Sequence, residues 1–342
     1  MSLFAIYAAV PFLLAALLYL LRKTVFANGL LLLLTLSLCF TGLEGYYRFY
    51  YCRSDGFGRL MKNFSDRYYH FDAYGLRASN LPLSKAQQNL VVLGDSHVFG
   101  AGLKRTTDRF SERLADHYRD FHIVNLGYPG WDTKTETQQL RIYANPEAPV
   151  GLVILTYFFN DIEEDATEAD RERISGPTPP PQPTVIDHAL QWVSRYSRFI
   201  ELFYFRIGYP RLVRDRLGQI QMFYKDPAVR DRHLASLEEL RREVEQEYGA
   251  HLLVVTLPFL HTTQLLNDTA FYQSFDENLR QRGFRYIDMQ PIFSSYRIKQ
   301  LQADRWDPHT NPLANRLVAD AIVGYLDAHP DLLQSNRPAR QP

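Results

Sequence analysis

Apolar residues fill most of the first 43 positions of the chain. One uncharged run covers residues 3–21, and a second, broken by Asn28 and Gly29, covers residues 25–43. Each run is long enough to cross a hydrocarbon core about 30 Å thick at a rise of about 1.5 Å per residue. Aromatic residues typical of a membrane–water interface follow: Tyr46, Tyr47, Phe49, Tyr50 and Tyr51. The pattern predicts two transmembrane helices over residues 1–45.

A cleaved signal peptide, a single span and a buried soluble hairpin are the alternatives to this anchor. A signal peptide needs a positively charged start and a small-x-small cleavage site, and the first run has neither. A lipoprotein anchor at Cys39 is disfavoured because Leu38 precedes it, where a small residue is expected. Cys39 and Cys52 suggest no disulfide framework and no metal site.

Basic residues on either side of the second run favour opposite membrane orientations. Arg22 and Lys23 lie between the runs and favour a cytoplasmic loop, which would place both chain ends outside. Arg48, Arg53 and Arg59 favour the reverse. Long domains cross largely regardless of such charges, so the short loop carries more weight. We expect an integral membrane protein with its large domain in the periplasm or at the cell surface.

Further along the chain, short apolar runs alternate with segments of helical periodicity. Predicted strands are centred on residues 90–93, 123–124, 152–155, 252–255 and 286–287. Helical spacing joins Phe110, Leu114 and Tyr118, and later Leu237, Leu240 and Val244. This alternation predicts an α/β fold, a three-layer α/β/α sandwich with a parallel sheet.

Two of the predicted helices have recognisable ends. Gly249 suits the end of the helix that precedes the fourth strand. The final helix should begin with Asn311 as its cap and Pro312 in its first turn. Its expected inner face is Leu313, Leu317, Ala321 and Tyr325.

The predicted organisation is an anchor over residues 1–45, a connecting region over 46–88, a main domain over 89–330 and a polar tail over 331–342. We expect the connecting region to pack on the main domain. An insertion at about 165–225 opens with a stiff linker containing Pro177, Pro179, Pro180, Pro181 and Pro183. The helical, aromatic segment 188–207 follows. It either covers the site or is a surface helix with no role in binding.

Charge and composition exclude one class of function. The 342 residues carry 38 basic and 38 acidic side chains, so the chain lacks the basic excess that nucleic acid binding requires. With 46% hydrophobic residues it can bury a substantial core.

Four segments carry candidate chemistry. Gly94-Asp95-Ser96 stands between a predicted strand and a helix, at the edge where open α/β sheets place their sites. Gly130, after the second strand, lets a backbone N–H approach a reacting oxygen. Asn160, after the third, supplies an amide donor. His309 is a candidate general base with Asp307 close by to orient it. Taken alone, each segment also fits an ordinary turn or cap.

Together these segments resemble the SGNH (GDSL-type) hydrolase family, which is named for a serine, a glycine, an asparagine and a histidine in four successive blocks. Ser96, Gly130, Asn160 and His309 match them, and the resemblance extends over residues 90–326 apart from the insertion. It implies an SGNH-hydrolase-like, flavodoxin-like fold, with Ser96 as nucleophile and His309 as base. Ser96, Gly130 and Asn160 would form the oxyanion hole. It implies no cofactor.

Two positions depart from the family pattern. The family commonly has aspartate three residues before the histidine, where this chain has Trp306. Asp307 is the predicted orienting carboxylate, because side chains two residues apart in an extended loop point to the same side. Asp304 is the weaker candidate, since it lies five residues from His309 and would need a turn to reach it. Phe158 replaces the usual glycine two residues before Asn160, which would narrow the substrate pocket. His97 follows Ser96 directly and should point elsewhere, and no metal signature is present.

The leading hypothesis is an esterase or O-acyltransferase acting on a short-chain, acetyl-like ester, with an acylated extracytoplasmic polysaccharide as one substrate. The membrane lipid around the anchor is the other expected partner, and any membrane protein partner is unknown. The alternatives are a membrane-tethered binding or scaffold protein that kept the fold, and a lipase-like enzyme acting on lipid esters. The intact set of four motif residues disfavours the scaffold.

Overall fold

The computed structural model describes residues 3–21, 27–54, 58–145, 147–175 and 185–333. They form two compact units, one from the described parts of Met1–Asp66 and Pro181–Arg214, the other from those of Arg67–Pro180 and Asp215–Pro342. Arg22 and Lys23, the prolines at 177–183 and the end of the polar tail lie outside the described residues.

The larger unit is built on one parallel sheet. Its strands are β1 (Gln88–Gly94), β2 (Phe121–Gly127), β3 (Val150–Phe158), β4 (His251–Leu257) and β5 (Arg285–Asp288). They are ordered β2-β1-β3-β4-β5, and every neighbouring pair is parallel. All five predicted strands are present, and the predicted three-layer α/β fold is confirmed.

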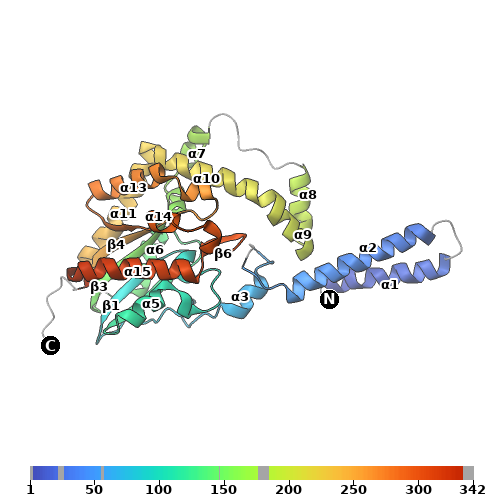
Figure 1. Ribbon diagram of the computed structural model, residues 1–342, viewed down its shortest axis with the longest axis horizontal. Coiled ribbons are helices and arrows are strands. Elements are labelled where there is room, and N and C mark those ends of the chain that lie inside the picture. The colour runs from blue at the N-terminus through green and yellow to red at the C-terminus, as the bar shows by residue number, and fades with distance from the viewer. Residues whose placement is uncertain (1–2, 22–26, 55–57, 146, 176–184, 334–342) are drawn as a thin grey trace. The chain divides into compact units, whose positions relative to one another are not determined.

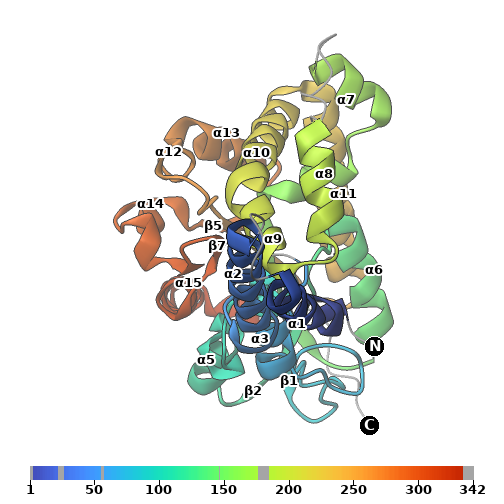
Figure 2. The same ribbon diagram turned by 90° about the vertical axis from the view of Figure 1, so that its right-hand side faces the viewer.

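Helices cover both faces of this sheet (Figures 1 and 2). Alternate strand residues such as Leu90 and Val92 pack into a core that includes α5 (Phe110–His117) and α15 (Pro312–Ala328). The intervening residues, such as Val91, are equally buried on the opposite face, where α6 (Thr133–Tyr143) and α11 (Pro227–Glu247) contact each other and the sheet. Both strand faces are therefore apolar, as expected of a covered parallel sheet.

Shorter elements complete the larger unit. They are α4 (Ser96–Phe99), the 3-10 helices η2 (Thr106–Asp108), η3 (Phe159–Glu164), η5 (Ile298–Gln300) and η6 (Pro330–Leu333), α7 (Glu168–Ser175), α12 (Thr263–Leu266), α13 (Thr269–Gln281), α14 (Gln290–Ser294), and the antiparallel pair β6 (Gln302–Asp304) and β7 (Asp307–Thr310). Helices α3 (Lys62–Tyr68) and α10 (Tyr209–Lys225) each run from one unit into the other.

The expected helix ends are present, but the expected face of the last helix is wrong. The Asn311 side chain accepts a hydrogen bond from the Ala314 N–H at 3.0 Å, and Gly249 has a φ of 62° after α11. The fully buried stripe of α15 lies one residue later than predicted, on Ala314, Val318, Ile322 and Leu326. The predicted stripe is only half-buried beside it, because the two apolar stripes have the same spacing and only packing against α5 distinguishes them.

The smaller unit contains the apolar hairpin and part of the expected insertion. Its elements are α1 (Leu3–Leu21), α2 (Ala27–Gly45), η1 (Tyr46–Tyr50), α8 (Val185–Ser194), α9 (Arg198–Phe203) and η4 (Tyr204–Gly208). Helices α1 and α2 lie side by side and antiparallel, with the Phe4 and Phe49 rings 4.9 Å apart and Thr41 Oγ1 donating to the Tyr7 carbonyl at 3.0 Å (Figure 1).

Among the described residues, the helix Asn28–Tyr50 is long and apolar enough to cross a membrane, and Phe4–Leu20 is a shorter apolar helix. Of the expected connecting region, residues 46–66 belong to this unit and only residues 67–88 to the unit with the sheet.

Candidate active site

The strand register brings three of the candidate residues to one edge of the sheet. Gly94 at the end of β1 pairs with Gly127 of β2 and with Thr156 of β3. Ser96, Gly130 and Asn160 each follow the end of one of these strands within three residues. The chain after β1 goes to β2 on one side and the chain after β3 goes to β4 on the other, so the strand order switches direction between β1 and β3. At the carboxyl edge beside such a switch point open α/β sheets form their binding crevices.

Glycines allow the turn that presents Ser96. A Cβ on Gly94 would lie 2.5 Å from Val98 Cγ2 and 2.9 Å from the Thr156 carbonyl oxygen. A Cβ on Gly127 would lie 2.4 Å from the Phe99 nitrogen. Helix α4 therefore folds back closely over the ends of β1 and β2. The Asp95 side chain caps it by accepting the His97 N–H at 2.8 Å, which leaves Ser96 as its first residue.

A continuous chain of hydrogen bonds joins Ser96, His309 and Asp307. His309 Nε2 lies 2.9 Å from Ser96 Oγ, and His309 Nδ1 lies 2.5 Å from Asp307 Oδ1. Asp307 and His309 are two residues apart on β7, so their side chains project to the same side of the strand. The carboxylate that contacts His309 is therefore that of Asp307. Asp304 pairs with Asp307 in the β6–β7 ladder.

The charges around His309 favour its protonated form. Burial by itself would lower the pKa of His309, but the charge of Asp307, its hydrogen bond and the charge of Asp95 together raise that pKa above its usual value. Asp95 is buried, and burial raises its pKa to about 6. The imidazole is thus a stronger base than an isolated histidine.

His97 does not face Ser96. Its Nδ1 lies 3.5 Å from Thr310 Oγ1, and its ring packs 4.6 Å from that of Phe158. Burial lowers the pKa of His97 well below its usual value, with a further contribution from His309. His97 is therefore a neutral packing residue between the serine turn and β3.

The loop after β2 holds Gly130 in a conformation that favours glycine. Its φ is +85°, and no atom lies within 4 Å of the place a Cβ would occupy. The Tyr128 N–H donates to the Gly94 carbonyl at 3.3 Å, which ties this loop to the end of β1. Gly130 itself is exposed.

A buried polar network that sequence reasoning missed supports the segment carrying Asn160. The Tyr224 hydroxyl donates to the Phe159 carbonyl at 3.1 Å and is hydrogen-bonded to the Tyr157 hydroxyl. Tyr157 contacts His233 Nε2 at 2.7 Å, and Asp165 contacts His233 Nδ1 at 2.8 Å. These residues come from β3, α10, α11 and the end of η3, so no local sequence signal groups them.

His261 is a second residue that sequence reasoning missed. It follows β4 at the carboxyl edge of the sheet, which is the one signal that could have marked it. Burial lowers its pKa to about 4, with further contributions from His309 and Arg216. Its Nδ1 is buried without a hydrogen-bond partner. His261 is thus a neutral polar group close to the charge of the Asp307–His309 pair.

Within the part of the chain that the structure describes, no group of three or more His, Cys, Asp or Glu side chains could hold a metal ion. The chemistry available is that of a serine hydroxyl in contact with a basic imidazole that is itself bonded to a carboxylate. Such a set can transfer an acyl group through a covalent serine intermediate.

No family model and no curated protein sequence matches this chain. Its fold is similar to a member of the lipolytic G-D-S-L family from Veillonella parvula, with 11% identity, 70% of this chain and 98% of the other covered, and a TM-score of 0.40. It is also similar to an acetyl xylan esterase, with 13% identity, 70% of this chain and 99% of the other covered, and a TM-score of 0.42. A third similar structure is a lipase/acylhydrolase from Enterococcus faecalis, with 12% identity, 71% of this chain and 97% of the other covered, and a TM-score of 0.38. Identities and TM-scores this low do not identify the reaction. The reaction is therefore argued from the geometry of the site alone.

Proposed function

We propose that this protein is a serine-dependent ester hydrolase or O-acyltransferase of the SGNH class. The observation that carries this proposal is the hydrogen-bonded chain from Asp307 through His309 to Ser96 Oγ. A capping serine or an ordinary turn does not need an imidazole on its hydroxyl, nor a carboxylate behind that imidazole. The same arrangement disfavours the scaffold alternative.

In the proposed reaction, Ser96 Oγ attacks the ester carbonyl while its proton passes to His309 Nε2. Asp307 holds the ring through Nδ1 and stabilises the imidazolium that forms. The tetrahedral intermediate collapses when His309 returns the proton to the leaving alcohol, which leaves Ser96 acylated. Water or a second hydroxyl then gives its proton to His309 and attacks the acyl carbonyl. His309 returns that proton to Ser96 Oγ as the Ser96–acyl bond breaks, which frees the serine and releases the acid or the new ester.

The oxyanion is proposed to form where the β1, β2 and β3 loops meet. The N–H groups of Ser96 and Gly130 and the side-chain amide of Asn160 are its candidate donors. The register supports this assignment because it brings the three strand ends together. Donors of this kind act mainly in the transition state, when the negative charge develops.

We propose a short-chain, acetyl-like O-acyl ester as substrate, with an acylated extracytoplasmic glycan as the acceptor or donor. Phe158 supports a small acyl group, because its ring lies between those of His97 and Phe259, at 4.6 Å and 5.2 Å, where the SGNH pattern has glycine. The apolar hairpin supports membrane attachment, and we propose that both of its helices span the bilayer with the sheet unit outside.

A lipase-like activity is the second candidate, because large apolar side chains are exposed on the helices that follow the proline-rich stretch. The two candidates differ in the acyl chain that they prefer. An enzyme for short esters loses kcat/KM as the chain lengthens, whereas a lipase gains it.

The test uses the full-length protein in detergent, assayed on p-nitrophenyl acetate and on a series of longer p-nitrophenyl esters. We expect turnover that falls with acyl length, and covalent labelling of Ser96 by a fluorophosphonate. Ser96→Ala should remove both, since losing the nucleophile costs several orders of magnitude in kcat. Turnover of Ser96→Ala within about tenfold of the parent rate would reject the nucleophile.

A further inference from the structure

The segment from α8 to η4 exposes large apolar side chains while it buries several of its polar ones. Val185, Trp192 and Ile207 are 85%, 60% and 69% exposed. Ser197 and Glu201, in the same segment, are 1% and 7% exposed. A surface helix of a water-soluble protein normally shows the opposite distribution.

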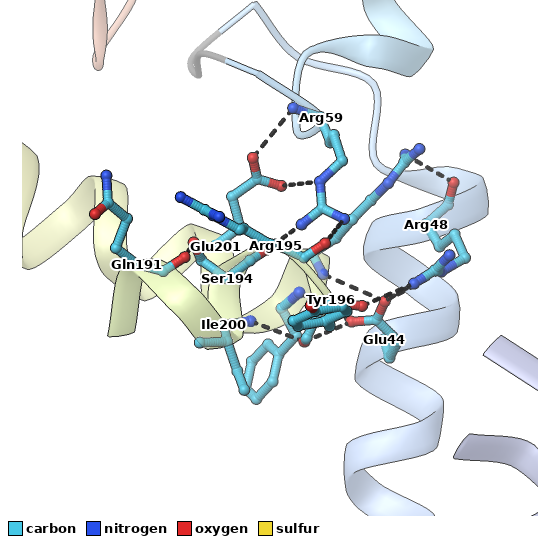
Figure 3. A network of polar contacts seen from close by, with 12 residues as sticks. Glu44, Arg48, Arg59, Gln191, Ser194, Arg195, Tyr196, Ile200 and Glu201 are labelled. Atoms are coloured by element: carbon cyan, nitrogen blue, oxygen red, sulfur yellow. Dashed lines mark hydrogen bonds and ion pairs between the residues drawn. The ribbon is translucent and has the colours of Figure 1, made fainter. Parts of the chain in front are cut away.

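The buried side of this segment is held by a carboxylate from the apolar hairpin. Glu44, near the end of α2, is fully buried. Its oxygens accept hydrogen bonds from Ser197 Oγ at 2.8 Å, from the Phe199 N–H at 3.1 Å and from the Arg198 N–H at 3.2 Å. Arg48 pairs with the same carboxylate at 2.6 Å (Figure 3). The start of α9 is therefore fastened to the end of α2.

Arg59 makes a second set of contacts within the same unit. Its guanidinium donates to the backbone carbonyls of Ser194 and Arg195, and its Nε lies 3.6 Å from a Glu201 oxygen (Figure 3). The Arg59 N–H donates to the Glu201 side chain at 3.1 Å. These contacts satisfy the C-terminal carbonyls of α8, so the polar groups of the segment face inward.

Aromatic side chains of α9 also contact aromatic side chains near the end of α2. The Phe199 ring stacks on Tyr47 at 5.8 Å and lies 6.1 Å from Phe40. The Tyr7 hydroxyl donates to the Tyr196 carbonyl at 3.1 Å. Tyr46, Phe49 and Tyr50 on the hairpin are themselves exposed. The exposed rings of Trp192, Tyr196 and Phe203 therefore extend the same aromatic zone.

From this geometry we infer that α8, α9 and η4 form a membrane-interface surface, seated in the headgroup and upper acyl region of the bilayer. The partner is the lipid itself, because a surface of exposed apolar and aromatic side chains, backed by buried and hydrogen-bonded polar groups, is stabilised where water is scarce. Trp and Tyr are the side chains that prefer this depth. The inference rests on the proposed membrane anchor but not on the proposed reaction.

The test measures the surroundings of Trp192 in the full-length chain. Trp131→Phe and Trp306→Phe leave Trp192 as the one tryptophan, and adding Trp192→Phe gives the blank. The protein is reconstituted into phosphatidylcholine vesicles brominated either near the headgroup end of the acyl chain or near its terminal methyl. We expect headgroup-end bromines to reduce Trp192 emission roughly by half, deeper bromines to reduce it less, and aqueous iodide to have little effect.

The alternative occupants give different results. Strong iodide quenching without bromine quenching would place Trp192 in water and overturn the inference. Protection from both quenchers would mean that protein covers the surface, which also overturns it. Alkaline carbonate extraction of the same vesicles tests the anchor separately. A chain that is retained by the vesicles but unquenched by bromine refutes the surface and leaves the anchor intact.

Discussion

His309 Nε2 lies 2.9 Å from Ser96 Oγ, although 213 residues separate the two in the sequence. Two independent parts of the fold produce this distance. The turn after β1 fixes the serine, and the β6–β7 pair fixes the histidine together with Asp307. At this distance His309 can take the Ser96 proton directly.

Asn160→Ala should lower kcat by about 10²–10³ with little change in KM, because an oxyanion donor acts mainly in the transition state. Steady-state kinetics on p-nitrophenyl acetate would measure both constants. Circular dichroism of the variant checks that the fold is retained. A change confined to KM would show that Asn160 binds the substrate and is not an oxyanion donor.

Asp307→Asn should lower kcat/KM by about 10²–10⁴, because the imidazole loses the group that fixes its tautomer and stabilises its positive charge. Asp304→Asn is the matched control, since it makes the same chemical change three residues earlier in the β6–β7 pair. We expect the control to retain most of the activity. Equal losses in both variants would contradict the assignment of Asp307 as the orienting carboxylate.

As the pH is lowered, kcat/KM should begin to fall at a pH above 6.5, the ordinary pKa of histidine. This decrease is the acid limb of the pH profile. Only neutral His309 can accept the Ser96 proton, and its raised pKa keeps it protonated to a higher pH. Activity therefore falls as the pH falls through that raised pKa. In Asp307→Asn the burial that lowers the pKa remains while the carboxylate is gone, so the limb should move to lower pH. An unmoved limb would show that another group titrates.

Tyr224→Phe should lower kcat by about tenfold, because the Phe159 carbonyl loses a donor directly before Asn160 and the amide is held less firmly. It should also lower the free energy of unfolding by about 1–3 kcal/mol, since Tyr157 loses a buried partner. Tyr143→Phe, which removes an exposed hydrogen bond to the Tyr74 carbonyl, is the control. Lower stability with unchanged kcat would restrict the network to a structural role.

Reporter fusions after Met1 and after Pro342 should both report the extracytoplasmic side. Two spans return the chain to the side on which it starts, and the basic loop at Arg22 and Lys23 favours the cytoplasm. Alkaline phosphatase and green fluorescent protein fusions distinguish the two sides. Opposite results for the two fusions would mean that a single helix crosses the membrane.

The sequence was sufficient to predict the sheet and to select the candidate residues. Runs such as residues 90–93 and 152–155 are apolar at every position, so both faces of each strand are apolar. Because these strands alternate with helices along the chain, such runs indicate a parallel sheet covered by helices on both faces. Asn311 and Pro312 marked the start of α15 because capping and a fixed φ are local properties. Ser96, Gly130, Asn160 and His309 were selected because their four segments together resemble the four blocks of the SGNH family. The position of each segment after a strand or before the last helix also fits an ordinary turn or cap.

Tertiary structure alone decided the features that depend on contacts between distant segments. The two-residue spacing already favoured Asp307 over Asp304, but the extended backbone that this argument needs is supplied by the β6–β7 pair, a short antiparallel element without a clear period in the sequence. The buried stripe of α15 was mispredicted because two neighbouring stripes are apolar, and packing against α5 selects between them. The hydrogen bonds of the Tyr224–Tyr157–His233–Asp165 network and of the Glu44 carboxylate at α9 join residues 67 to 155 positions apart, so no local pattern reveals them.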